Sequence, residues 1–149
     1  MAKYYEVVVY TASLNKYADP LLDQLDPKGC IRARLFRDSC VYHEGNYVKD
    51  LSRLDRDLSQ AIIIDNSPSS YIFHPENAID CTSYIDDAHD RELDHIAKFL
   101  KGIRKVNDVR KVCSMWRQWP QIPHTDGILY PHDDLESSSG EEKKSDKVS

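Results

Sequence analysis

The segment from Ala61 to Pro68 constrains the fold most. Its first four residues are apolar, Asp65 and Asn66 follow, and Pro68 ends the strand. A continuous apolar run is typical of a strand buried on both faces of a parallel sheet. Ligand sites of such α/β sheets lie beyond the carboxyl ends of the strands, and Mg²⁺ takes oxygen ligands of the Asp and Asn kind. The segment therefore predicts an α/β fold with a site at Asp65 and Asn66, although the same residue types also form simple Asx turns.

Composition indicates one domain followed by a tail. The chain has 149 residues, of which 40% are apolar and 30% charged, with a net charge of -5. Residues 119–149 contain seven acidic and three basic side chains and many serines. Such a segment buries too little apolar surface to fold, so we predict a domain over 1–118 and a disordered acidic tail over 119–149.

Charge and hydropathy exclude several function classes. The body of the chain is nearly neutral, which argues against direct nucleic-acid binding. The sequence contains no run of 18 apolar residues, so it predicts no membrane-spanning helix. The four cysteines are widely spaced and form no Cys-x-x-Cys pair, which favours a reducing compartment over a zinc site or a disulfide framework. Cys40 and His43 have metal-ligand spacing, but without a second ligand pair we interpret Cys40 as a buried thiol near a hairpin.

Apolar periodicity predicts alternating strands and helices. We expect the 90–102 helix to be capped by Asp86 or Asp87 and to bury Leu93, Ile96, Ala97, Leu100 and Ile103. Pro20 fits the first helix only if it lies in the first turn. The predicted strands are 6–10, 32–36, 61–65 and 77–81, the hairpin strands are 40–43 and 46–49, and the helices are 15–25, 90–102 and 108–117.

Polar groups follow three of the predicted strands. Thr11 comes after the first strand, Lys49 after the hairpin, and Asp65 with Asn66 after the apolar run. A hydroxyl, an ammonium, a carboxylate and an amide at one sheet edge could bind phosphate with the help of magnesium. Each of these residues is common at a strand end, so the spacing alone is only suggestive.

Six segments occur in the order found in one known family: 7–13, 16–20, 32–37, 45–52, 64–68 and 71–78. Together they resemble the small C-terminal-domain phosphatases, in the NLI-interacting-factor-like branch of the haloacid dehalogenase superfamily, over residues 1–115. The resemblance implies a three-layer parallel sheet with a small β-hairpin insert. It also implies a Mg²⁺-dependent protein serine phosphatase that acts through an aspartyl-phosphate on the RNA polymerase II tail or other nuclear phosphoproteins, in the nucleus or between nucleus and cytoplasm.

The resemblance assigns roles to individual positions. Thr11, Lys49 and Asp65 match catalytic residues: Thr11 hydrogen-bonds the phosphoryl group, and Lys49 holds the phosphoaspartate. Asn66 matches a direct magnesium ligand, with Asp65 as a partner to the metal shell or to Lys49. Residues that match the substrate-binding positions are Arg37, which contacts phosphate, and Leu14 and Tyr17, which belong to an apolar pocket for a substrate proline.

One family motif does not occur in this sequence. The nucleophile and the general acid of the family lie in an Asp-x-Asp-x-Thr motif on a central strand, and no such motif follows an apolar strand here; Asp55-Arg56-Asp57 leads into Leu58 and Ser59. Met1 matches a point inside the family domain. We therefore expect an N-terminally truncated domain that lacks its first, central strand and is inactive alone. The alternatives are a catalytically dead phosphopeptide- or partner-binding module and a non-functional fragment.

Overall fold

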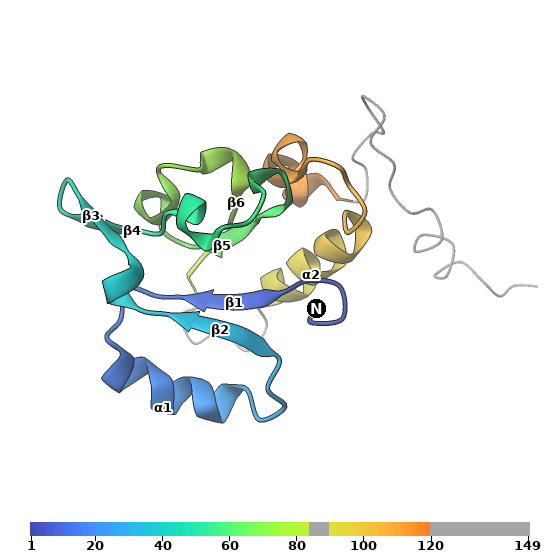
Figure 1. Ribbon diagram of the computed structural model, residues 1–149. Helices are drawn as coiled ribbons and strands as arrows, with labels where there is room; N and C mark the ends of the chain where they lie inside the picture. Colours follow the sequence, from blue (N-terminus) through green and yellow to red (C-terminus); the bar gives the residue numbers. More distant parts are fainter. Residues whose placement is uncertain (84–89, 120–149) are drawn as a thin grey trace, which may run out of the picture.

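Two parallel strand pairs and one hairpin form the β-structure in the computed structural model, which describes residues 1–83 and 90–119 (Figure 1). Strand β1 (Val7–Tyr10) pairs with β2 (Ile31–Leu35), and β5 (Ile63–Asp65) pairs with β6 (Ala78–Asp80), both in parallel. Strand β3 (Val41–His43) is antiparallel to β4 (Asn46–Val48). The chain is thus mixed α/β with small parallel sheets. The three-layer arrangement and the missing central strand stay predictions.

The hairpin has the turn that its sequence favours. Glu44 and Gly45 connect β3 to β4 with φ angles of 49° and 84°. Positive φ at both central residues matches the twist of the flanking strands, and glycine adopts this conformation without a steric penalty. The turn places Val48 in the core and Lys49 directly after it.

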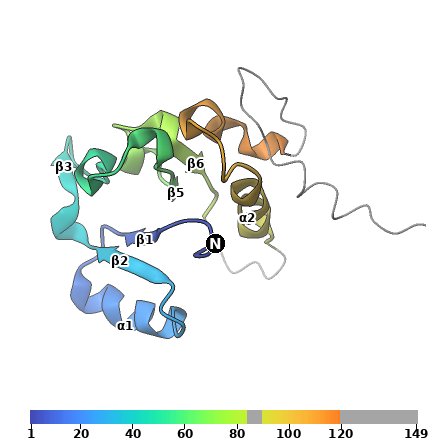
Figure 2. The ribbon, with the colours of Figure 1, turned by 45° about the vertical axis from the view of Figure 1, so that its right-hand side comes forward.

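Strand β5 is buried on one face only. Ile63 and Asp65 are 7% and 8% exposed, whereas Ile64 between them is 39% exposed. The expectation that this run is buried on both faces is therefore wrong at Ile64. Within the described residues, β5 pairs only with β6 and β1 only with β2, and Figures 1 and 2 show the two pairs as separate units.

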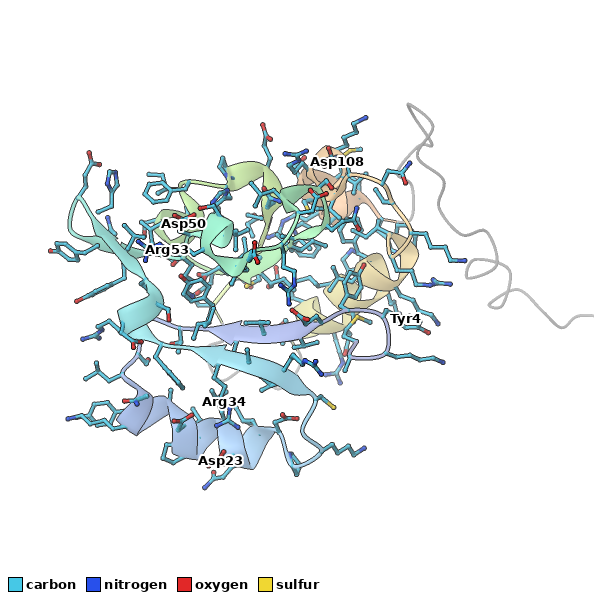
Figure 3. The ribbon with its side chains drawn as sticks, viewed as in Figure 1. Tyr4, Asp23, Arg34, Asp50, Arg53 and Asp108 are labelled. Atoms are coloured by element: carbon cyan, nitrogen blue, oxygen red, sulfur yellow. The ribbon has the colours of Figure 1, made fainter. Side chains whose placement is uncertain are left out.

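Helix α1 (Asn15–Leu25) lies beside β2, on the side away from β5 and β6 (Figure 2). Its bounds are those predicted, but Pro20 lies beyond the first turn, where the missing N–H removes one helical hydrogen bond. Arg34 of β2 reaches across to Asp19 and Asp23, at 3.0 and 2.9 Å (Figure 3). These exposed ion pairs orient the helix on the strand pair, because α1 buries only Ala18.

The main core surrounds helix α2 (Glu92–Gly102). Ile96, Leu100 and Ile103 are buried as predicted, but Leu93 is 70% exposed and the fully buried Phe99 was not in the predicted stripe. The buried side of the helix therefore includes Phe99 and leaves Leu93 in solvent. The predicted caps Asp86 and Asp87 lie outside the described residues.

Two 3₁₀ segments, Val109–Lys111 and Cys113–Gln118, replace the single helix predicted over 108–117. The carboxylate of Asp108 accepts the Arg110 N–H at 3.0 Å, and Val112 between the segments leaves helical geometry at φ -123° and ψ -19°. The four apolar residues predicted to lie on one side of this segment are all buried: Val109, Val112, Cys113 and Trp116.

The described part of the chain ends on the core. Trp119 packs against Phe99, with ring centroids 6.1 Å apart, and a Cβ on Gly102 would lie 2.1 Å from the Trp119 ring. Glycine is therefore required at the end of α2, because any larger side chain would clash with the Trp119 ring. Residues 120–149, which make up nearly all of the predicted tail, lie outside the described residues. No helix in the described ranges is long and apolar enough to cross a membrane.

Candidate functional site

A buried ion pair lies where β4 and β5 end. Lys49 follows β4, Asp65 ends β5, and Lys49 Nζ lies 2.5 Å from Asp65 Oδ2. The two side chains are 14% and 7% exposed. The second oxygen of Asp65 accepts the Ser67 N–H at 2.9 Å, and the Lys49 backbone N–H donates to Ser70 O at 2.8 Å. The structure thus brings two of the predicted catalytic residues into direct contact.

Arg37 and Thr11 lie together at the end of β1. Thr11 donates its N–H to Leu35 O at 2.8 Å, and its hydroxyl accepts the Ser13 N–H at 3.0 Å. Arg37 Nε donates to Ala12 O at 2.7 Å, and the guanidinium lies 4.9 Å from the centre of the Tyr47 ring. Arg37 is therefore fixed by the segment that follows β1 and by the hairpin.

Cys40 lies beside Thr11. Its sulfur contacts Thr11 O at 3.8 Å. Burial raises the pKa of the Cys40 thiol, while the positive charges of Lys49 and Arg37 oppose that rise. Cys40 therefore lies next to Thr11, and the pKa of its thiol responds to the charges of both cations. The sequence predicts a buried thiol near a hairpin at this position; Cys40 is only partly buried and lies beside the candidate site residue Thr11.

Leu14 and Tyr17 form an exposed shelf beside Arg37. Leu14 precedes α1, Tyr17 lies in its first turn, and their exposed fractions are 37% and 67%. The Arg37 N–H donates to Ser13 O at 3.1 Å, which holds this end of α1 near the arginine. Lys16 Nζ lies 5.0 Å from the centre of the Tyr17 ring. The described residues therefore offer an apolar surface here and not an enclosed pocket.

Asn66 follows Asp65 directly, and its side-chain amide already makes one hydrogen bond. It donates its side-chain N–H to Ser83 Oγ at 2.6 Å, and both oxygens of the neighbouring Asp65 accept hydrogen bonds, from Lys49 and Ser67. No group of three or more Asp, Glu, His or Cys residues that could hold a metal ion occurs in the described ranges. Mg²⁺ usually keeps several waters and takes one or two protein oxygens. Asn66 and Asp65 fit a largely hydrated ion of this kind.

Sequence reasoning missed three residues at this site. Tyr10 donates its hydroxyl to Ser39 O at 2.5 Å, and Asp50 Oδ1 lies 2.9 Å from His74 Nε2. Asp50 had a local signal, because Asp-Leu-Ser is a capping pattern, and its side chain accepts the Ser52 N–H at 3.0 Å. His74 had no comparable signal, because its partner is 24 positions away along the chain.

Three carboxyls in and around the site have a lowered pKa. At Asp80 the main cause is the hydrogen bond from the Trp116 indole N–H, at 2.9 Å. Burial raises the pKa of Asp50 and of Glu92, but hydrogen bonds outweigh burial in both cases. The donors are His74 and Ser52 at Asp50, and Thr82 at Glu92.

These shifts predict acid sensitivity. The ordinary pKa values are 3.8 for Asp and 4.5 for Glu, and the folded values lie below them. The unfolded chain therefore binds more protons near pH 4, so the stabilisation is complete above the ordinary values and is lost as pH falls through the folded ones. We expect urea titrations to give a constant unfolding free energy from about pH 6 down to about pH 5 and a steep fall below about pH 4. Stability that is unchanged at pH 3 would contradict this.

Comparisons with known proteins identify the family to which the chain belongs. Residues 1–110 match the model of the family described as NLI interacting factor-like phosphatase. The chain is 61% identical over 112 residues to a probable C-terminal domain small phosphatase of Dictyostelium discoideum, covering 75% of this chain and 37% of that protein. It is 59% identical over 109 residues to the human CTD small phosphatase-like protein, covering 73% and 40% of the two chains.

A second human relative is the carboxy-terminal domain RNA polymerase II polypeptide A small phosphatase 1. It is 54% identical over 112 residues, which cover 75% of this chain and 43% of that protein. The chain thus matches about two fifths of the length of these relatives. Because the family model covers well over half of these 149 residues, the chain belongs to the family of NLI interacting factor-like phosphatases.

Proposed function

We propose that this chain has a CTD small phosphatase-like function and that its candidate site binds the phosphoserine side chain of a protein substrate. The observation that carries the proposal is the largely buried pair of Lys49 and Asp65, together with Thr11 and Arg37, which lie side by side at the end of β1. Buried cations held by a carboxylate are costly to maintain unless they are well paired, and such groups are common at functional sites.

Each residue has a distinct role in this proposal. Lys49 and Arg37 supply positive charge to the phosphoryl oxygens, and charge-assisted hydrogen bonds are the stronger kind. Thr11 adds a neutral donor, and Asp65 orients the Lys49 ammonium. Leu14 and Tyr17 offer an apolar surface to a residue next to the phosphoserine, such as proline. The substrate is then a phosphoserine protein such as the RNA polymerase II tail, which the name of one human relative mentions, and its place in the cell is the nucleus.

Magnesium belongs to the proposal through Asn66 and Asp65. These residues would hold a hydrated Mg²⁺ beside the phosphate, where the ion would neutralise phosphoryl charge. Asn66 is oriented for this by Ser83, and Asp65 by Lys49 and Ser67.

Phosphoryl transfer needs two further groups. Covalent catalysis through an aspartyl-phosphate requires a nucleophilic carboxylate and an acid that protonates the leaving serine oxygen. The 149 residues contain no Asp-x-Asp motif on an apolar strand that could supply both. We therefore propose that these residues alone bind phosphoserine without hydrolysing it.

Titration with matched serine-proline peptides tests this proposal. We expect the 149-residue chain to bind the phosphorylated peptide about tenfold more tightly than the unphosphorylated one, the scale of one hydrogen bond to a charged group. The preference should weaken as salt is raised. We expect no Mg²⁺-dependent hydrolysis of an aryl phosphate.

Two variants serve as a matched pair for that titration. Arg37→Gln removes a cation from the site, and Lys28→Gln removes one from the exposed turn between α1 and β2. Only Arg37→Gln should reduce the preference for the phosphorylated peptide. Equal binding of both peptides by the parent chain would refute the proposed phosphate site, and turnover that Asp65→Asn abolishes would refute the claim that these residues bind without hydrolysing.

A further inference from the structure

Asp50 and His74 form a second, partly buried hydrogen-bonded pair next to Lys49. His74 Nε2 lies 2.9 Å from Asp50 Oδ1, and their side chains are 12% and 19% exposed. Because a carboxylate can only accept, Nε2 carries the proton. Neither residue touches the phosphate in the proposed function, so the pair calls for another explanation.

The pair joins the two segments that carry the Lys49–Asp65 contact. Lys49 and Asp50 lie on the segment after β4, and Asp65, Ser70 and His74 lie on the segment from the end of β5 onward. Three links cross between them: Lys49 Nζ to Asp65 at 2.5 Å, Lys49 N–H to Ser70 O at 2.8 Å, and Asp50 to His74 at 2.9 Å. Since Lys49 and Asp50 are neighbours, fixing Asp50 also restricts the backbone that aims the Lys49 ammonium.

Asp50 also connects this region to the end of β1. Its carboxylate accepts hydrogen bonds from the N–H and the hydroxyl of Ser52, at 3.0 and 2.6 Å. Burial raises the pKa of Tyr10, and a hydrogen bond with the Asp50 backbone opposes that rise. Tyr10 immediately precedes Thr11 in the sequence. Asp50 therefore lies near Tyr10, on the segment that carries Thr11, and contacts His74, on the segment that follows Asp65.

We propose that Asp50 and His74 are positioning residues that hold the Lys49 ammonium on Asp65 and toward the phosphate. This inference rests on the proposed function for its binding consequence. The position of the ammonium itself can be measured without any ligand. A lysine that moved freely would spread its charge over many rotamers, whereas a fixed backbone and one ion-pair partner leave few.

A pair of histidine substitutions separates positioning from mere stabilisation. Glutamine places an N–H donor near the position of Nε2, and asparagine is too short to do so. In His74→Gln we expect a phosphopeptide preference within twofold of the parent chain, and in His74→Asn a loss of about fivefold. Nitrogen-detected NMR of the lysine ammonium groups should show a slowly exchanging Lys49 signal in the parent chain and in His74→Gln, and none in His74→Asn.

His43 provides the matched control. It is 44% exposed on the side chain and contacts Phe73, the neighbour of His74, with ring centroids 5.2 Å apart. His43→Asn should leave both the preference and the Lys49 signal unchanged. If His74→Asn does not fold, Asp50→Ser, which is too short to reach His74, should give the same losses.

The outcomes are distinct. A lower urea midpoint in His74→Asn with an unchanged Lys49 signal and peptide preference would overturn the positioning role. A parent chain without phosphopeptide preference would refute the proposed function, while the Lys49 signal in the two His74 variants would still test the positioning of the ammonium.

Discussion

Replacing Lys49 with methionine is expected to lower the unfolding free energy by about 3 kcal/mol, because it leaves a buried carboxylate without its charged partner. Asp65 is only 8% exposed, and its remaining hydrogen bond comes from the Ser67 N–H. Methionine keeps the length and the apolar stem of lysine, so the packing loss is small. Urea denaturation at pH 7 measures the effect.

The control for this prediction neutralises both partners. Asp65→Asn alone should also destabilise the chain, whereas the Lys49→Met and Asp65→Asn double variant should recover most of the loss, because no unpaired charge remains buried. All three variants should lose the preference for the phosphorylated peptide if they remain folded. A double variant as unstable as the sum of the single ones would show that Lys49 and Asp65 contribute independently.

Replacing Phe99 with alanine is expected to cost about 4 kcal/mol of unfolding free energy. Phe99 is fully buried in the cluster that includes Ile79, Ile96 and Trp116, and it also contacts the ring of Trp119. Removing the ring takes away its burial and leaves a cavity that the surrounding side chains fill only in part. Thermal or urea unfolding, followed by tryptophan fluorescence, measures the change.

The same helix supplies the comparison. Leu93→Ala on α2 should change the unfolding free energy by less than about 0.5 kcal/mol, because Leu93 is 70% exposed. The sequence pattern placed Leu93 in the buried stripe and omitted Phe99. Equal losses in the two variants would show that the predicted stripe, and not the observed one, faces the core.

Local patterns determined the regular elements well where short-range signals agree. The bounds of α1 match the prediction, and the strands of the hairpin and the two parallel pairs lie within a residue or two of those expected. These elements depend on apolar periodicity and on turn residues such as Glu44 and Gly45, which act within a few positions. The 3₁₀ geometry of 109–118 could not be read in this way, because apolar spacing is similar in both helix types over one or two turns.

The candidate site also has a part that the sequence predicted and a part that it did not. The sequence placed Thr11, Lys49, Asp65 and Asn66 at the ends of strands, and its resemblance to a family identified Arg37, Leu14 and Tyr17. It did not show that Cys40 contacts Thr11, or that His74 pairs with Asp50. Both contacts join segments that are separated along the chain.

The sequence by itself determined the family, the strand and helix positions, and the residue types available for binding phosphate. The tertiary structure alone decided which charges are buried and which partners they have. Lys49 and Asp65 are 16 positions apart along the chain. Local sequence patterns relate residues only a few positions apart, so they could not predict this pair. Their pairing follows from packing Val48 and Ile63 into the interior, because burying these apolar side chains fixes the ends of β4 and β5 and so brings the charges that follow them into contact.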